Sequence, residues 1–481
     1  MNLIAQYPQL KVLQELCRKS KTKIYLVGGF VRDYLLGHTK NDFDFAVERH
    51  ALKLARSFAN KIKGAYVLLD EERGCARVVK KETQRICTFD FADFRDKTLQ
   101  KDLTLRDFTI NTLVVDLLAI KSDGDLDDYV KDYKKGRKDL KTKRLRMVAK
   151  RAFRDDPLRM VRAFSLRASL GLSIARATLA QIKKDKDLLR DVSPERVRDE
   201  LFKILATPRA AAILTEMDKI DLLEKIIPQI RVMNQCLQGG YHHLDVWPHS
   251  LETVVQMEGV LAQLKDQEVI EYIQEKLGGD RSRAALMKLA VLLHDIGKPA
   301  TRKKENGRTS FHGHEHVGKE IVHHIAKMLK LSKHERHILE DMVRWHLRPG
   351  YLSNFKQPSE KAIYRYFRDT KEEAVSILLL SLADQRATRG PLTTEKDQEH
   401  HEKICLDLIQ RYFDKKKEKP FIRLITGNDL IKRLKLKPSP LFGEILTKVE
   451  EEQSLGKLKT RDEAVDLAKR IAEQAKKKGG R

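Results

Sequence analysis

Two groups of residues near the N-terminus have the types and spacing needed to handle a nucleoside triphosphate. Asp42 and Asp44 alternate with phenylalanines, which predicts a strand with both carboxylates on one face. Two carboxylates side by side can hold a pair of Mg²⁺ ions, which prefer hard oxygen ligands. Just upstream, Gly28 and Gly29 follow a short apolar run and let backbone N–H groups approach a phosphate closely. Two metals beside a phosphate-binding turn are suited to in-line nucleotidyl transfer.

Either pattern alone is common, but their order and close spacing resemble the class II branch of the nucleotidyltransferase superfamily. This branch contains the bacterial CCA-adding tRNA nucleotidyltransferases and their poly(A) polymerase relatives. Its motif, Gly-Gly-x-Val-Arg-Asp-x-Leu-Leu-Gly followed by Asp-x-Asp, matches residues 28–37 and 42–44. The resemblance implies that Asp42 and Asp44 ligate Mg²⁺ ions that activate a tRNA 3′-hydroxyl. The residues implied to hold the incoming triphosphate are Gly28, Gly29 and Arg32.

A second motif of the same family, Arg-Arg-Asp-Phe-Thr-Ile-Asn, is matched from Arg106 to Asn111, with Leu105 in place of the first arginine. By resemblance, Arg106 and Asp107 help to hold the triphosphate and sugar, and Asn111 supports the nucleotide site. A guanidinium suits phosphate oxygens because it is always charged and donates two parallel hydrogen bonds. The leucine removes one such cation from the motif. A capped helix start with an ordinary surface arginine is the alternative interpretation.

Residues 154–159 resemble the family's base-reading motif Glu-Asp-x-x-Arg, with Asp155 at the place of the glutamate. Asp156 can accept a hydrogen bond from the amino group of a base, and Arg159 can donate to the adjacent ring nitrogen. Positions three apart on a helix share a face, so both are expected to meet one base edge. Cytosine and adenine present this order of groups, whereas uracil and guanine reverse it. An ordinary Asp-Pro helix start is the alternative, and the upstream motifs favour base reading.

Histidines concentrate in the second half of the chain, where twelve of the 16 lie between residues 242 and 346. The adjacent His294 and Asp295, followed by Gly-Lys, resemble an HD domain, which is a helical metal-dependent phosphohydrolase. Such a centre would activate water against a phosphoester. Imidazole and carboxylate together suit Mn, Fe, Ni, Zn or Mg, so the divalent metal is not identified. The implied ligands are His249, His294, Asp295 and Asp384, with His314 and His346 as further ligands or phosphate contacts.

The composition favours a polyanionic partner. The 95 Lys and Arg residues exceed the 69 Asp and Glu residues, which gives a net charge of +26 and points to nucleic acid. A generally charged surface is the alternative. The five cysteines include no Cys-x-x-Cys pair, which argues against a zinc ribbon or disulfide framework and fits a reducing compartment. Since no signal segment or membrane-spanning run stands out, we expect a cytoplasmic protein without a membrane partner.

Strand and helix patterns alternate up to about residue 118, whereas the chain after about residue 144 has almost wholly helical patterns. With the resemblances, this implies an α/β nucleotidyltransferase (polymerase-β-like) head followed by all-α neck, HD and tail domains. Residues 415–420 are expected to form a linker. The expected domains are the head (1–143), a neck that reads the base and binds RNA (144–235), the HD domain (236–395) and a tRNA-binding tail (396–481).

These features predict template-independent addition of CCA to tRNA 3′ ends from CTP and ATP. Within the family, a split-activity enzyme that adds only CC or only the terminal A, and a poly(A) polymerase, are the alternatives. From another class, the chain could be an HD phosphohydrolase with a degenerate head. The residues that argue against this are intact: Asp42, Asp44, Arg106, Asp156 and Arg159. A non-catalytic RNA-binding protein has no use for two carboxylate sets. The sequence makes no prediction of the oligomeric state or of the HD substrate.

Overall fold

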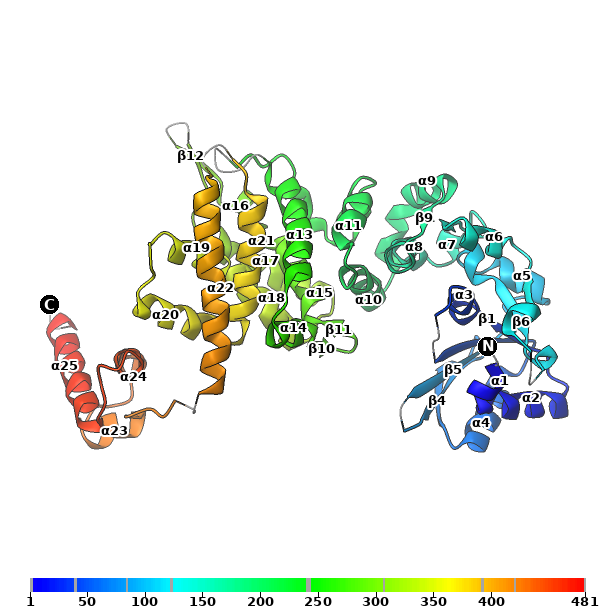
Figure 1. The fold of residues 1–481 in the computed structure, drawn as a ribbon, viewed down its shortest axis with the longest axis horizontal. Helices are drawn as coiled ribbons and strands as arrows, with labels where there is room; N and C mark the ends of the chain where they lie inside the picture. The colour runs from blue at the N-terminus through cyan, green and yellow to red at the C-terminus, as the bar shows by residue number, and fades with distance from the viewer. Residues whose placement is uncertain are drawn as a thin grey trace. The chain divides into compact units, whose positions relative to one another are not determined.

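The computed structural model describes residues 3–38, 41–83, 85–121, 124–238, 244–305, 308–390, 393–418 and 421–479. The chain forms two compact units. The first contains Met1–Ile204 and Glu216–Ile226, and the second contains Leu205–Thr215 and Ile227–Arg481. Figure 1 shows the large sheet within the blue-to-cyan N-terminal part of the ribbon and helices through most of the rest.

The first unit is built on a seven-stranded sheet with the strand order β3-β4-β5-β2-β1-β6-β7. Strands β2 and β5 are parallel, and all other neighbours in this sheet are antiparallel. The strands are β1 (Ile24–Val27), β2 (Asp42–Val47), β3 (Ala65–Asp70), β4 (Cys75–Lys81), β5 (Ile86–Asp93), β6 (Leu113–Asp116) and β7 (Val130–Asp132).

Alternation along β2 and β5 separates an apolar face of the sheet from a carboxylate face. Phe43 stacks on Phe89 with ring centroids 5.1 Å apart, and Phe45 stacks on Phe91 at 5.2 Å. Phe58, on helix α4 (Ala51–Ile62), meets the rings of β5 edge-on. Because successive side chains of a strand point to opposite faces, the aspartates of β2 are directed away from this aromatic core.

Helices flank the sheet and continue beyond it. Helix α8 follows a proline, and its buried stripe includes Met160, Val161 and Phe164. The helices of this part are α1 (Leu3–Gln6), α2 (Pro8–Ser20), α3 (Gly29–Leu35), α5 (Leu99–Thr104), α6 (Gly136–Lys141), α7 (Ala152–Asp155), α8 (Leu158–Leu170), α9 (Arg176–Asp185), α10 (Pro194–Leu205) and α12 (Leu222–Ile226), with the short strands β8 (Arg144–Leu145) and β9 (Ser173–Ile174). Helix α11 (Ala210–Asp218) is divided between the two units.

The second unit is helical, and α21 (Ala374–Ala387) lies at its centre. Every residue from Ala374 to Ala383 is buried, as expected for a helix that is apolar on all sides. The other helices are α13 (Val246–Gln263), α14 (Gln267–Gln274), α15 (Arg283–Leu293), α16 (Lys298–Thr301), α17 (His314–Met328), α18 (Lys333–Trp345), α19 (Arg348–Ser353), α20 (Glu360–Thr370) and α22 (Glu395–Lys417), with the short strands β10 (Lys276–Gly278), β11 (Arg281–Ser282), β12 (Lys303–Glu305) and β13 (Arg308–Ser310).

The C-terminal helices α23 (Gly427–Lys432), α24 (Pro440–Ser454) and α25 (Arg461–Gly479) enclose a small apolar core of their own. On α24, Glu451 is 2% exposed and pairs with Arg365 and Lys361 of α20 at 2.7 and 3.0 Å. No helix among the described residues is both long enough and apolar enough to cross a membrane.

The expected linker at residues 415–420 was partly wrong. Lys415, Lys416 and Lys417 form the last turn of α22, while residues 419 and 420 lie outside the described residues. Cations at a helix C-terminus interact favourably with the helix dipole, so a lysine run can end a helix as readily as it can form a linker. The neighbouring Tyr412 and Phe413 are buried, which anchors this end of α22 in the second unit.

Candidate functional site

Strand register brings three carboxylates to one face of the head sheet. Asp44 lies opposite Val27 of β1 on one side and opposite Asp90 of β5 on the other. Asp42 is two residues earlier on the same face and is exposed. The two predicted metal ligands therefore lie together, beside a third carboxylate that the sequence analysis did not identify.

Asp90 is held in place by Arg77 of β4. The guanidinium donates from Nε and Nη2 to the two carboxylate oxygens at 2.7 and 2.8 Å. The sequence did contain a signal for this residue, since Phe89-Asp90-Phe91 repeats the alternation of residues 43–45. The signal becomes informative only when β5 is known to pair with β2.

The carboxylate face has the character of a cation-binding site. Burial and the neighbouring Asp90 raise the pKa of Asp44, and the guanidinium groups of Arg106 and Arg162 act in the opposite direction. A carboxylate with a raised pKa beside other carboxylates gains most from a divalent cation, which relieves their mutual repulsion. The donors are hard oxygens, so the residues present fit Mg²⁺ held by Asp42 and Asp44.

Gly28 brings the backbone against this carboxylate face. Its φ is +73° with ψ of −139°, a conformation that residues with a side chain avoid. A Cβ placed there would lie 2.8 Å from Oδ2 of Asp44. The backbone N–H of Gly29 hydrogen-bonds the same carboxylate. The turn is therefore shaped by its contact with the proposed metal ligand.

We expect Gly28→Ala to lower the unfolding free energy by about 1–3 kcal/mol and also to displace Asp44, so that nucleotide addition is impaired. Gly37→Ala is the matched control, because Gly37 also has a positive φ (+79°) but an added Cβ would meet nothing within 4 Å. Thermal unfolding and primer extension of both variants check this prediction. Equal loss of activity in the two variants would contradict it.

Arg32, Asn111 and Asp107 form one buried network beside the glycine turn. Arg32 Nε donates to Asp33 Oδ1 at 2.7 Å, and its Nη1 donates to Asn111 Oδ1 at 2.7 Å. The amide of Asn111 then donates to Asp107 Oδ1 at 3.0 Å. Gly29 lies next to Arg32 Nη2. Four predicted nucleotide-binding residues are thus brought together: Gly29, Arg32, Asp107 and Asn111.

Arg162 is a second residue that the sequence analysis missed. Burial alone would raise the pKa of Asp107, but Arg162, with hydrogen bonds from Asn111 and from the amide of Phe108, lowers it. The guanidinium lies 3.3 Å from Asp107 Oδ2 and also interacts with Asp44. Arg162 lies one turn beyond Arg159 on α8, and this spacing was the available signal.

The predicted nucleotide-binding Arg106 follows helix α5 and is tied to it. Its Nε and Nη2 donate to Asp102 Oδ2, both at 3.3 Å. It also contributes to the electrostatic environment of Asp44. Arg106 therefore lies on the edge of the carboxylate face.

The predicted base-reading residues Asp156 and Arg159 lie near each other, but not on one helix. Helix α8 begins at Leu158, and Asp156 before it is extended, with φ of −154° and ψ of 100°. The expectation that both lie on one helix was wrong, because Pro157 disfavours helical backbone at the preceding residue. Asp156 Oδ1 accepts from the Leu158 amide at 3.3 Å, so the alternative of a capped helix start also holds.

Both side chains of this pair have protein partners. Asp156 Oδ2 accepts from Arg196 Nη2 at 2.9 Å. Arg159 is buried, which lowers its pKa, and donates to the carbonyl oxygens of Leu105 at 2.9 Å and Ala152 at 3.2 Å. The carbonyl of Leu105, the residue that departs from the family motif, thus positions the arginine. These contacts hold the Asp156 carboxylate and the Arg159 guanidinium in position.

The four predicted HD ligands come together in the second unit. His249 Nε2 lies 2.9 Å from Asp384 Oδ1, and His294 Nε2 lies 3.6 Å from the same oxygen. His294 Nε2 is also 3.2 Å from Asp295 Oδ2. Among the described residues, His249, His294 and Asp384 form one group able to hold a metal ion, and Asp295, His314 and His346 form another. His242 and His243, at the start of the histidine-rich stretch, lie outside the described residues.

The imidazoles of this centre are oriented for ligation. The Nδ1–H groups of His294, His314 and His346 donate to the carbonyl oxygens of residues 291, 311 and 343 at 2.7–2.8 Å. This leaves each Nε2 directed at the cluster, which is how metal-bound histidines are held in proteins. Buried His294 Nε2 has no hydrogen-bond partner of good geometry.

The charges of this centre also favour a cation. Burial would lower the pKa of His294, but Asp295 and Asp384 raise it to about 10. Burial and the neighbouring histidines lower the pKa of His346 to about 3, which keeps it neutral, as a metal ligand must be. Nitrogen and oxygen donors together fit a divalent transition metal or Mg²⁺.

Four family models match successive parts of the chain. They describe a poly(A) polymerase head domain (24–146), an RNA- and SrmB-binding site of polymerase A (171–233), an HD domain (264–389) and tRNA nucleotidyltransferase domain 2 (405–468). The A-adding tRNA nucleotidyltransferase of Deinococcus radiodurans is 34% identical, with 93% of this chain and 95% of that protein covered. The chain belongs to the bacterial tRNA nucleotidyltransferase family. This confirms the resemblance and the predicted enzyme class.

Other members of the family agree with this assignment. The CC-adding tRNA nucleotidyltransferase of Thermus thermophilus is 30% identical over 91% of each chain. A solved structure of the Thermotoga maritima CCA-adding enzyme complexed with tRNA has a TM-score of 0.60 and 20% identity, with 97% of this chain and 94% of that chain covered. It supports the fold, and the predicted α/β head followed by helical regions is confirmed.

Proposed function

We propose that this tRNA nucleotidyltransferase adds C, C and A to tRNA 3′ ends from CTP and ATP. The observation that carries the proposal is the face formed by Asp42, Asp44 and Asp90 beside the Gly28 turn. Such a face has the hard oxygen donors that a two-metal nucleotidyl transfer requires. The activity uses substrates of the cytoplasm, which is where we expect the protein to act.

In this reaction the tRNA 3′-oxygen forms a bond to the α-phosphorus of the nucleoside triphosphate. The bond between the α-phosphorus and the oxygen that bridges the α- and β-phosphates breaks, and pyrophosphate leaves. Asp42 and Asp44 would hold Mg²⁺, which activates the hydroxyl and neutralises charge on the phosphates. Arg106 and Arg162 lie near Asp44 and supply fixed positive charge for the triphosphate. The Arg32–Asn111–Asp107 network keeps the glycine turn in position.

Base choice is assigned to Asp156 and Arg159. The carboxylate accepts from the amino group of cytosine or adenine, and the guanidinium donates to the ring nitrogen beside it. Uracil and guanine present a carbonyl where the amino group is needed, so an acceptor would face an acceptor. One fixed pair therefore suits both CTP and ATP, which supports addition of the whole CCA sequence by one site.

The test uses tRNAs that end at the discriminator base, at C and at CC, each incubated with Mg²⁺ and with CTP, ATP or both. Completion of every primer to CCA supports the full activity. A long A tail would instead indicate a poly(A) polymerase, and absence of incorporation on every primer would refute the transferase proposal.

Addition of A alone is the second candidate, because the 34% identical relative over nearly the whole chain is an A-adding enzyme. The multifunctional CCA protein of Neisseria gonorrhoeae covers only 67% of this chain, at 29% identity. In the same assay an A-adding enzyme extends only the CC-ended primer, and a CC-adding enzyme stops after two cytidines. The primer that ends at the discriminator base separates these outcomes.

For the second unit we propose a phosphoesterase centre with a divalent metal. The observation that favours it is the group of Nε2 atoms directed at Asp295 and Asp384, with His294 Nε2 lacking a partner of good geometry. The ligands would be His249, His294, Asp295 and Asp384, with His314 and His346 completing a second group. The proposed domain limits remain 1–143, 144–235, 236–395 and 396–481.

We expect His294→Ala to lose bound transition metal and at least about a hundredfold of the hydrolysis of bis(p-nitrophenyl) phosphate, while nucleotide addition is unchanged. His337→Ala is the matched control, since His337 lies on α18 and outside both metal-ligating groups. Metal content by elemental analysis gives a readout besides activity. Unchanged metal content in His294→Ala would contradict the assignment.

A further inference from the structure

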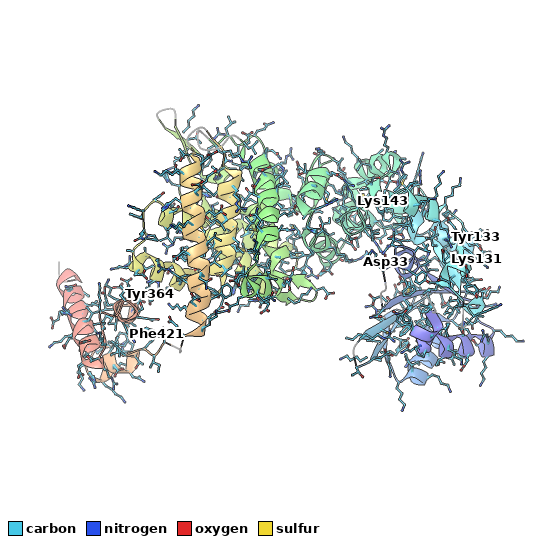
Figure 2. The ribbon with its side chains drawn as sticks, in the orientation of Figure 1. Asp33, Lys131, Tyr133, Lys143, Tyr364 and Phe421 are labelled. Carbon is cyan, nitrogen blue, oxygen red and sulfur yellow. The ribbon has the colours of Figure 1, made fainter. Side chains whose placement is uncertain are left out.

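A cavity of about 290 Å³ lies within the second unit, where α20, the C-terminal end of α22 and the segment that enters the tail meet. Its wall combines aromatic rings with lysines. Figure 2 labels Tyr364, on α20, and Phe421, which lies between α22 and α23. The lining includes Tyr364, Phe367, Tyr412, Phe421, Lys371 and Lys415.

Two of the lining rings have a lysine ammonium group near the ring face. Lys415 Nζ lies 5.7 Å from the ring centroid of Tyr364, and Lys416 Nζ lies 5.2 Å from that of Tyr412. The rings of Phe367 and Tyr412 are 6.1 Å apart and tilted by 40°. Phe421 is 46% exposed, so a large apolar ring stands open to solvent beside the cavity. Such a ring gains free energy when another flat group covers it.

The charges at the cavity leave two lysines available. Arg368 is paired with Asp369 at 2.8 Å, and Lys416 lies 3.5 Å from Glu372. Within the part of the chain that the structure describes, neither Lys371 nor Lys415 forms an ion pair. Two carboxylates also line the cavity, and each has a cation partner: Glu372 pairs with Lys416, and Glu450 pairs with Arg423 at 3.1 Å. The cavity thus offers stacking surfaces together with two lysines that form no ion pair among the described residues.

We propose that this pocket binds an unstacked nucleobase of the tRNA substrate, with its flanking phosphates at Lys371 and Lys415. The inference rests on the proposed function for the identity of the RNA. Every base has a π-face that stacks on tyrosine or phenylalanine, and the adjacent phosphates require cations at the rim. An acidic peptide would use the lysines but has no need of the rings. The net charge of +26 agrees with an RNA ligand.

The pocket is separate from the nucleotide-adding face, which belongs to the first unit. A base bound here would increase the affinity for tRNA without taking part in nucleotidyl transfer. Two linked contacts on one ligand act by raising effective concentration, so removal of one weakens binding more than it changes the chemical step. The expected signature is therefore a change in KM for tRNA at constant kcat.

The test measures tRNA binding and nucleotide addition with the full-length protein. In the variant with both Tyr364→Ala and Phe421→Ala, we expect the Kd and KM for tRNA to rise about tenfold, with kcat unchanged. Ile422→Ala is the matched control, because Ile422 is 82% exposed and next to Phe421 but does not line the cavity. Phe421→Ala alone is also measured. Because this side chain is exposed, its removal should weaken tRNA binding without a folding defect.

Lys415→Ala gives an independent readout. Loss of one phosphate contact should lower the slope of log Kd against log salt by about 0.7–1. Wild-type values of Kd and slope in the double variant, in Phe421→Ala and in Lys415→Ala would overturn the proposal. A protein ligand would then be the remaining candidate for the pocket. A loss in kcat with an unchanged Kd for tRNA would also overturn it. If the wild type binds tRNA but adds no nucleotide, the proposed function fails while this binding test still decides the pocket.

Discussion

Asp44→Asn is expected to lower the rate of nucleotide addition by at least about a thousandfold. The side chain lies between Asp90 and the Gly28 turn, where burial and the charge of Asp90 raise the pKa of its carboxyl group. An amide keeps the shape but loses the charge that holds a divalent cation. Single-turnover incorporation of labelled CMP and AMP into tRNA measures the effect.

The loss should be one of metal binding rather than of folding. Because Asn removes a carboxylate that repels Asp90, the metal-free variant should unfold at a temperature no lower than that of the wild type. Mg²⁺ should raise the unfolding temperature of the wild type but not of the variant. Asp70→Asn, at the end of edge strand β3, is the control and should behave as the wild type. Activity within tenfold of the wild type in Asp44→Asn would contradict this role.

Asp156→Asn is expected to relax base choice. An aspartate can only accept a hydrogen bond, whereas an asparagine amide can rotate to donate to the carbonyl group of uracil. We expect the preference for CTP over UTP, measured as the ratio of kcat/KM, to fall about ten- to a hundredfold. The rate with CTP should change much less, because the amide oxygen still accepts from the amino group.

The neighbouring carboxylate provides a close control. Asp155 pairs with Arg151 at 2.9 Å, whereas Asp156 pairs with Arg196. Asp155→Asn should therefore leave the CTP-to-UTP preference at the wild-type value. A preference that falls equally in both variants, or in neither, would show that Asp156 does not read the base.

The sequence predicted those parts of the head site that depend on short-range patterns. Alternation in residues 42–45 is enough to place two carboxylates on one strand face, because the period of a strand is two. Asp90 and Arg162 were missed, since their roles depend on strand pairing and helix packing between segments far apart in the chain. A single sequence does not encode that pairing in a local pattern.

Two local details also differed from expectation. Proline at position 157 delays the start of α8, so Asp156 precedes the helix instead of lying on it. The lysine run at 415–417 continues α22 because buried aromatic residues just before it fix the helix in its unit. In the first case a proline overrode the helical spacing used for the prediction, and in the second the preceding aromatic residues overrode the charge pattern.

The HD centre shows what a resemblance can add to a pattern. Asp384 lies far along the chain from His249, and only the family order of ligands connected them in advance. In the structure the two side chains are 2.9 Å apart. No family order connected the residues of the aromatic pocket in advance. Its rings come from α20, from the C-terminal end of α22 and from the segment after it, and neither periodicity nor a motif in the sequence marked them.

The most direct test of the central claim follows a tRNA that ends at the discriminator base, with CTP, ATP and Mg²⁺, at single-nucleotide resolution. The proposed function predicts two cytidines, then one adenosine, then a stop, with no product from the variant that combines Asp42→Asn and Asp44→Asn. Wild-type protein that adds no nucleotide, or a double variant that adds nucleotides at the wild-type rate, would contradict the account.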